Sequence, residues 1–140
     1  GSEMCIRDSL SNVDMRALCL TGANLKLSKL NGCSLAQADL EKANLEEADL
    51  QYADLSEVNL QGANLRRACL IGADLRAADL TDADLGEADL RSANLRGAVL
   101  NRANLWHANL KDANMVYANI DGAKGLPVEI YEQLRSKTES

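Results

Sequence analysis

Histidine and cysteine are the side chains best suited to chemistry near neutral pH, and this chain has few of either. His107 is the single histidine, and the cysteines are Cys5, Cys19, Cys33 and Cys69. A Ser-His-Asp or Cys-His arrangement needs the histidine beside its nucleophile, and no serine clearly falls near His107. Zinc and redox sites need short C-x-x-C spacing, which is absent. We therefore expect reduced structural thiols, with no catalytic residue and no metal site.

Aspartate is frequent enough to suggest carboxylate pairs or a calcium site. However, the aspartates recur at a fixed spacing, and Asn replaces Asp freely at the same position. A site that depends on negative charge would not tolerate this exchange. The sequence also contains no phosphate-binding glycine loop and no EF-hand pattern. We expect no cofactor, and we predict that the chain is not an enzyme.

A five-residue repeat positions all of these side chains. From Leu10 to Ile120 every fifth residue is apolar and almost always Leu, preceded by a small residue and then Asp or Asn, as in Ala48-Asp49-Leu50. A helix would scatter these leucines around its surface, and a continuous strand would alternate them between its faces. The period instead fits a chain that turns at every repeat in the same sense. Four repeats then close a coil of twenty residues, and coils stack at a spacing of about 4.8 Å.

In such a coil, the Leu and the small residue both face inward. Four leucines fill a narrow lumen, so only small residues fit beside them and no ligand cavity remains. Larger or polar residues replace Ala at five inward positions, mostly in the first coils: Val13, Leu18, Ser28, Cys33 and Val58. We expect the lumen to be packed more heavily near its N-terminal end.

Residues twenty apart should stack, which allows outward columns to be listed from the sequence. Two of these columns alternate in charge between coils, and such cross-strand pairs help to fix the register. The first column consists of Leu27, Glu47, Arg67, Glu87 and His107. The second, beside the first, consists of Lys26, Glu46 and Arg66.

The motif A-[DN]-L-x-x, over about residues 9–123, resembles that of the pentapeptide-repeat family. The resemblance implies an all-β solenoid, specifically a right-handed quadrilateral β-helix. At this length it would have about 5–6 coils of about 20 residues each. This agrees with the geometry of the five-residue period. The motif is specific for a fold and says little about function.

The chain divides into three parts. Residues 1–8, which open with Gly-Ser as a cloning scar would, form a tag or non-repeat leader; residues 9–123 form the β-helix. Residues 124–140 contain Pro127, then early acidic and late basic residues, which predict a short capping α-helix and tail. Such a helix would cover the open edges of the last coil. A dimer contact is the alternative role, and the uncapped N-terminal end is the other candidate surface for self-association.

The first candidate partner surface is acidic. Residues 36–60 (the acidic segment) contain a single cation, Lys42, and carry a net charge of −6, whereas residues 61–120 (the balanced segment) contain seven acids and seven bases. The segment wraps about one coil as a girdle. It is either a solvated surface or a docking surface for a basic partner. Its acids are Asp39, Glu41, Glu46, Glu47, Asp49, Asp54 and Glu57.

The second candidate surface is apolar. Val99, Val116 and Tyr117 should lie near one corner of the last coils, with Trp106 toward the opposite corner. Aromatic residues are enriched at the cores of interfaces. Packing of Tyr117 against the C-terminal tail is the alternative.

Charge and composition limit the partners and the location. The net charge of −6 disfavours binding to nucleic acid or to anionic membranes. No apolar run approaches the roughly 18–20 residues of a membrane helix, and no apolar signal segment follows the start. We expect a cytoplasmic protein with protein partners, no direct nucleic-acid binding and no membrane contact.

The leading interpretation is a non-catalytic protein-interaction or scaffold module of bacterial type. The family resemblance suggests a second interpretation, because some members of the family are DNA mimics that bind DNA gyrase and confer quinolone resistance. That group spreads its acidity along the rod and favours Phe in the core, whereas this chain has no Phe and its acids cluster. A third interpretation is a rigid spacer within a larger protein, which coding sequence upstream of residue 9 would favour.

Overall fold

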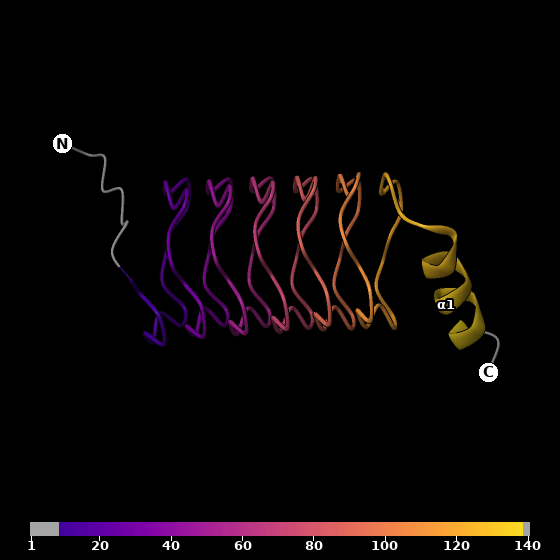
Figure 1. Ribbon diagram of the computed structural model, residues 1–140, viewed down its shortest axis with the longest axis horizontal. Helices are drawn as coiled ribbons and strands as arrows, with labels where there is room; N and C mark the ends of the chain where they lie inside the picture. Colours follow the sequence, from indigo (N-terminus) through magenta and orange to yellow (C-terminus); the bar gives the residue numbers. More distant parts are fainter. Residues whose placement is uncertain (1–8, 139–140) are drawn as a thin grey trace.

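The computed structural model describes residues 9–138 as a rod of stacked coils with one helix beyond the last coil (Figure 1). Parallel bridges join each bridged residue to the one twenty positions later, from Ser9↔Lys29 to Asn104↔Lys124. Each bridge is a single residue pair, so the described residues contain no longer strand. The coil therefore has the twenty-residue period that the sequence predicts.

The core is a continuous column of leucine and alanine along the axis of the rod. Leu50, Leu65 and Ala48 are 0% exposed, and the other repeats of the middle coils are equally buried. Ser28, Cys33 and Val58 also lie inward, as expected, and the Ser28 hydroxyl donates a hydrogen bond to the carbonyl of Leu25 at 2.6 Å. Within the described coils, these buried side chains fill the lumen.

Two of the expected inward residues are not buried. Val13 is 39% exposed and Leu18 is 46% exposed. Both belong to the first described coil, which only the second coil covers. The prediction of heavier packing at this end is therefore wrong for these two residues, because described residues cover this coil on one side only; Met15, in the same coil, is 9% exposed and belongs to the core.

Each corner is a four-residue turn that imposes a backbone constraint. The amide of the small residue donates to the carbonyl of the preceding core residue, as from Ala48 to Leu45 at 3.0 Å. The second corner residue has positive φ, for example 58° at Glu47 and 69° at Gly32. Side chains branched at Cβ are strained in this region. Accordingly, no Val, Ile or Thr occupies this position in the described corners.

The Asp or Asn of each repeat fixes the corner that follows it. Its Oδ1 accepts a hydrogen bond from the amide two residues later, at 3.1 Å from Gln51 to Asp49 and at 3.0 Å from Arg66 to Asn64. Both residue types carry the required acceptor, and such side-chain turns are common for both. The free exchange of Asp and Asn therefore has a structural cause.

Helix α1, Val128–Thr138, follows Pro127 and lies at the C-terminal end of the rod (Figure 1). Ile130 is 6% exposed, and Leu126 and Leu134 pack against the core. The side-chain oxygen of Gln133 accepts a hydrogen bond from the amide of Met115 at 2.9 Å. The helix thus contacts both the apolar end of the lumen and the backbone edge of the last coil.

The outward columns stack largely as expected. Arg67 lies 3.7 Å from Glu47 in the preceding coil and 2.7 Å from Glu87 in the following one. Lys26 lies 4.0 Å from Glu46. Arg66, expected to pair with Glu46, instead pairs with Asp84 at 3.3 Å. The long arginine reaches the Asp of the preceding face in the next coil, which a list of residues twenty apart does not include.

Candidate functional site

The described thiols and the histidine form no reactive cluster. Cys33 is buried, which raises the pKa of its thiol to about 11, and burial also raises the pKa of Cys69. Both thiols are thus disfavoured as thiolates at neutral pH. The described part of the chain contains no group of three side chains that could hold a metal ion. Cys5 lies outside the described residues, and His107 is exposed.

The acids of the acidic segment are distributed around the coil. Glu41, Glu46 and Glu57 lie at three different corners, and the aspartates lie on the faces between corners. Residues on successive corners point away from the axis in different directions. The structure therefore places these residues as a girdle and does not gather them on one face.

The aspartates of the girdle all take part in the turns. Asp39, Asp49 and Asp54 are half-buried, and each accepts the amide hydrogen bond that fixes its corner, at 3.1, 3.1 and 3.0 Å. Their carboxylates still carry charge to the surface. The charge itself is not needed for the turn, since Asn serves equally well in neighbouring repeats.

The glutamates differ in their partners. Glu46 and Glu47 face the cations Lys26 and Arg67, which lie outside the acidic segment. Glu57 accepts a hydrogen bond from the neutral amide of Gln37 at 2.7 Å. No described side chain forms a hydrogen bond or ion pair with the carboxylate of Glu41. Glu41 and Glu57 are therefore the glutamates of the girdle whose charge is not neutralised by a contact.

The apolar candidates do not form one patch. Val99 and Val116 are half-buried, and Val99 is bridged to Asp79 and Asn119 in the neighbouring coils. Tyr117 is 61% exposed, and the guanidinium of Arg96 lies over its ring at 4.9 Å from the ring centre. One face of the Tyr117 ring therefore contacts an arginine of the previous coil, and the side chain stays largely exposed.

Trp106 lies at a different corner, two repeats before Tyr117. It is 57% exposed, and its ring centre lies 6.3 Å from that of His107. Gly125 passes so close to the backbone of Trp106 that an added Cβ would approach its nitrogen to 2.6 Å. The segment that follows the last coil, at Gly125, therefore packs directly against the backbone of this corner.

One corner that the sequence analysis did not single out is hollowed at three places. It comprises residues 11–12, 31–32, 51–52, 71–72, 91–92 and 111–112, and we call it the hollowed corner. Its hollows have volumes of about 360, 310 and 400 Å³ in order along the rod. The last lies between Leu110 and Ile130 of α1. The sequence indicates these hollows by an alternation of small and large residues at twenty-residue intervals, as in Gly32, Tyr52 and Gly72.

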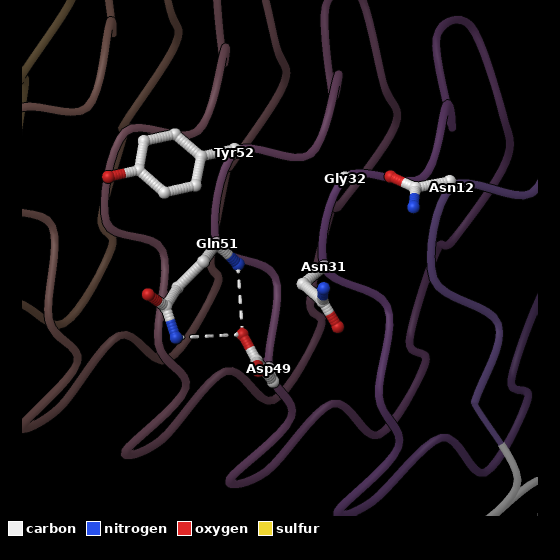
Figure 2. A pocket seen from close by; sticks show the side chains of 6 residues that line it. All are labelled: Asn12, Asn31, Gly32, Asp49, Gln51 and Tyr52. Carbon is white, nitrogen blue, oxygen red and sulfur yellow. Dashed lines mark hydrogen bonds between the residues drawn. The ribbon is translucent and has the colours of Figure 1, made fainter.

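Figure 2 shows the first of these hollows. Gly32 lies between Asn12 and Tyr52, which occupy the same corner position one coil to either side. The side-chain oxygen of Asn12 points over Gly32, and an added Cβ there would collide with it. Asp49 and Gln51 line the hollow from the adjacent face and corner. The Gln51 side chain also donates to the Asp49 carboxylate at 3.2 Å.

No helix in the described residues is long and apolar enough to cross a bilayer.

Comparison with protein families gives one match. The model described as "Pentapeptide repeats", in eight copies, matches residues 28–67, 59–97 and 88–124. These ranges together cover more than half of the chain. No match was found among curated protein sequences.

Solved structures with the same fold include two from cyanobacteria. The pentapeptide-repeat protein Rfr23 of Cyanothece 51142 is 27% identical, with a TM-score of 0.64, covering 84% of this chain and 91% of that chain. The pentapeptide-repeat protein alr5209 of Nostoc PCC 7120 is 41% identical, with a TM-score of 0.59, covering 65% and 78%.

A third structure shares the fold at lower identity. It is a trypsin-treated M102R form of QnrB1, a plasmid-mediated fluoroquinolone resistance protein. It is 18% identical, with a TM-score of 0.56, covering 88% of this chain and 68% of that chain.

Proposed function

Because the chain belongs to the pentapeptide-repeat family, for which a right-handed quadrilateral β-helix is expected, we propose that it is a non-catalytic protein-interaction module. In this proposal the rod is a rigid support, and partners bind its outer surface. The acidic segment is the part of that surface that recognises a basic protein.

One observation carries this proposal: the acidic segment holds seven acids against the single cation Lys42, and within the described residues ion pairs reach only Glu46 and Glu47 among them. In the balanced segment, five of the six arginines pair with carboxylates of the same repeat or of a neighbouring coil, as Arg76 does with Asp74 at 2.6 Å. In the acidic segment, Glu41 and Glu57 have no cationic partner among the described residues. A girdle with a net charge of −6 attracts a partner of opposite charge and increases its rate of association.

The absence of an enzyme site is part of the same proposal. The lumen is filled, and buried Cys33 is held as a thiol. The recurrent aspartates support turns, so their number is explained without a catalytic carboxylate pair.

Binding to DNA gyrase as a DNA mimic has weaker support. A mimic needs negative charge along the rod, but in the balanced segment Arg66, Arg91 and Arg102 pair with Asp84, Asp89 and Asp82. The likeness to QnrB1, at 18% identity, concerns the fold alone. A gyrase supercoiling assay separates the two functions: we expect no inhibition at low or physiological salt, and salt-sensitive inhibition would establish the mimic.

We propose further that α1 caps the solenoid. Its support is the burial of Ile130 and the hydrogen bond from Met115 to Gln133. A cap of this kind shields open backbone edges from pairing with another chain. Replacing Ile130 with Asp should loosen the helix and promote self-association, measurable by sedimentation; an unchanged monomer with intact helix signal would contradict the capping role.

The interaction proposal is tested by comparing two variants that lose equal charge. Glu41→Gln with Glu57→Gln removes the unneutralised glutamates, and Asp121→Asn with Glu132→Gln removes two exposed acids near the C-terminal end. Each variant is immobilised, and proteins retained from a bacterial extract are quantified against the parent. We expect the first variant to lose roughly two-thirds or more of specifically retained protein and the second to retain it. Equal retention by all three forms would overturn the proposal.

A further inference from the structure

The hollow at Gly32 has the shape and chemistry to receive a side chain from a partner. It is lined by Asn12, Asn31, Gly32, Asp49, Gln51 and Tyr52, and no Lys or Arg is among them. Of the Asp49 carboxylate, only Oδ1 is engaged within the described residues, by the amide and the side chain of Gln51. Asp49 Oδ2 and the side-chain oxygen of Asn12 therefore accept no hydrogen bond from the described residues (Figure 2).

Tyr52 provides an exposed aromatic surface at the rim of this hollow. This residue is 70% exposed, the highest value among the large hydrophobic residues whose exposure the structure describes. The ring lies over Gly72 of the next coil, where an added Cβ would approach Cε1 to 2.5 Å. The absence of a side chain at Gly72 lets the ring lie over that residue, and the absence of a side chain at Gly32 leaves space on the other side of the ring.

A second tyrosine in the same chain shows which side chain can pack against the ring at this corner position. Tyr117 holds the equivalent corner position, and the residues 21 and 20 positions before it are Arg96 and Gly97. The guanidinium of Arg96 lies over the Tyr117 ring. The residues 21 and 20 positions before Tyr52 are Asn31 and Gly32. The two tyrosines therefore have glycine at the same place in the preceding coil. They differ in the residue before that glycine, which is Arg96 for Tyr117 and the shorter Asn31 for Tyr52.

Charge favours a cation at the unfilled position. Tyr52 lies within the acidic segment, whose net charge is −6, and Asp49 presents a carboxylate in the same hollow. A guanidinium suits the site better than an ammonium, because it is planar, stacks on aromatic rings and can donate two hydrogen bonds to one carboxylate. We propose that this hollow binds an arginine side chain of a basic partner protein, with the guanidinium on Tyr52 and its donors directed to Asp49 and Asn12.

This inference rests on the proposed interaction function and names the chemistry of its partner. The probe is a short blocked peptide with a single arginine, titrated into the full chain while the backbone amide signals of Gly32 and residue 49, which line the hollow, are followed by NMR. Peptides with lysine or citrulline in place of arginine complete the set, since citrulline keeps the shape and loses the charge. We expect affinity in the order arginine, lysine, citrulline, with the arginine peptide at least about threefold tighter than the citrulline peptide.

Matched variants assign the binding to this hollow. Tyr52→Leu removes the ring, and Asp49→Asn removes the charge while keeping the turn acceptor. Their controls are Tyr117→Leu and Asp54→Asn, which make the same changes at other corners. We expect each test variant to weaken binding of the arginine peptide about threefold or more, and each control to change it less than about twofold.

Two results would overturn the inference: equal affinity for the arginine and citrulline peptides, or unchanged affinity in Tyr52→Leu. The proposed function can survive this failure. If the double glutamate variant loses partner retention while Tyr52→Leu keeps it, the interaction module stands and the arginine site is wrong. If Tyr52→Leu loses both the peptide and the retained partner, both proposals are supported.

Discussion

The acidic segment and the balanced segment share one backbone and one core but present different surfaces. Leu45 and Leu65 are both fully buried, and the corners of both segments are closed by the same side-chain hydrogen bond. Outside, five of the six arginines in the balanced segment pair with a carboxylate of that segment, as Arg102 does with Asp82 at 2.9 Å. The acidic segment has a single cation of its own, Lys42. The comparison teaches that the repeat fixes the inside, whereas the two outward corner residues of each repeat are free to encode a partner.

The largest effect should be the same in both segments. Leu45→Asp and Leu65→Asp each place an unpaired charge in the filled lumen, and we expect each to lower the free energy of unfolding by at least about 4 kcal/mol. Chemical denaturation monitored by circular dichroism measures this. If one variant were nearly as stable as the parent, the two segments would not share one core.

A smaller effect should arise from backbone strain at the corners. Lys42 and Ala77 have φ of 58° and 57°, one in each segment, and neither forms an ion pair. Replacing either with Val should cost about 1–2 kcal/mol, because a side chain branched at Cβ is strained at positive φ. Thermal melts of both variants test this, with Ala77→Gly as the control that relieves the strain. A Val variant as stable as the parent would contradict the account of the corner.

The smallest expected effect on stability concerns the arginine pairs of the balanced segment. The hydrogen bond from Arg76 lowers the pKa of Asp74 below its usual value. A carboxyl with a lowered folded pKa stabilises the fold above its unfolded pKa, and this contribution is lost as pH falls through the folded pKa. We therefore expect the parent to lose some stability below about pH 4, and Arg76→Gln to lose less.

The pKa of Asp74 can be measured directly by NMR titration of its carboxyl carbon. In Arg76→Gln it should return toward the usual value, while the pKa of Asp89, which is lowered by its own partner Arg91, should not change. An Asp74 pKa unaffected by the substitution would mean that the pair does not persist in solution.

Much of the fold could be predicted from the sequence, because one constraint repeats along the chain. A five-residue apolar period permits few backbone paths, so the inward leucines, the twenty-residue stacking and the Arg67 column all follow from it. The exposure of Val13 and Leu18 did not follow, since the repeat marks which side chains face inward but not which of them stay covered in a coil at the end of the described rod. The pairing of Arg66 with Asp84 also did not follow, because it depends on the direction of a long side chain.

The candidate site was only partly accessible from the sequence. The acidic segment is evident from a count of charges, but the count does not separate turn-forming Asp49 from unneutralised Glu41. Tyr52 was not singled out, because its significance depends on Gly32 and Gly72 lying beside it one coil away. Only the register, together with the arginine over Tyr117, makes the unfilled position at Tyr52 recognisable.

The most direct test of the central claim is a map of amide chemical shifts across the whole rod on addition of a basic peptide that contains several arginines and lysines. We predict that the shifted amides cluster around the girdle and the Gly32 hollow, within about residues 31–60, and weaken as salt is added. Residues 61–120 should change little, since their acids and bases are equal in number and five of their six arginines pair with carboxylates. Shifts spread evenly along the rod, or concentrated in the balanced segment, would contradict the account.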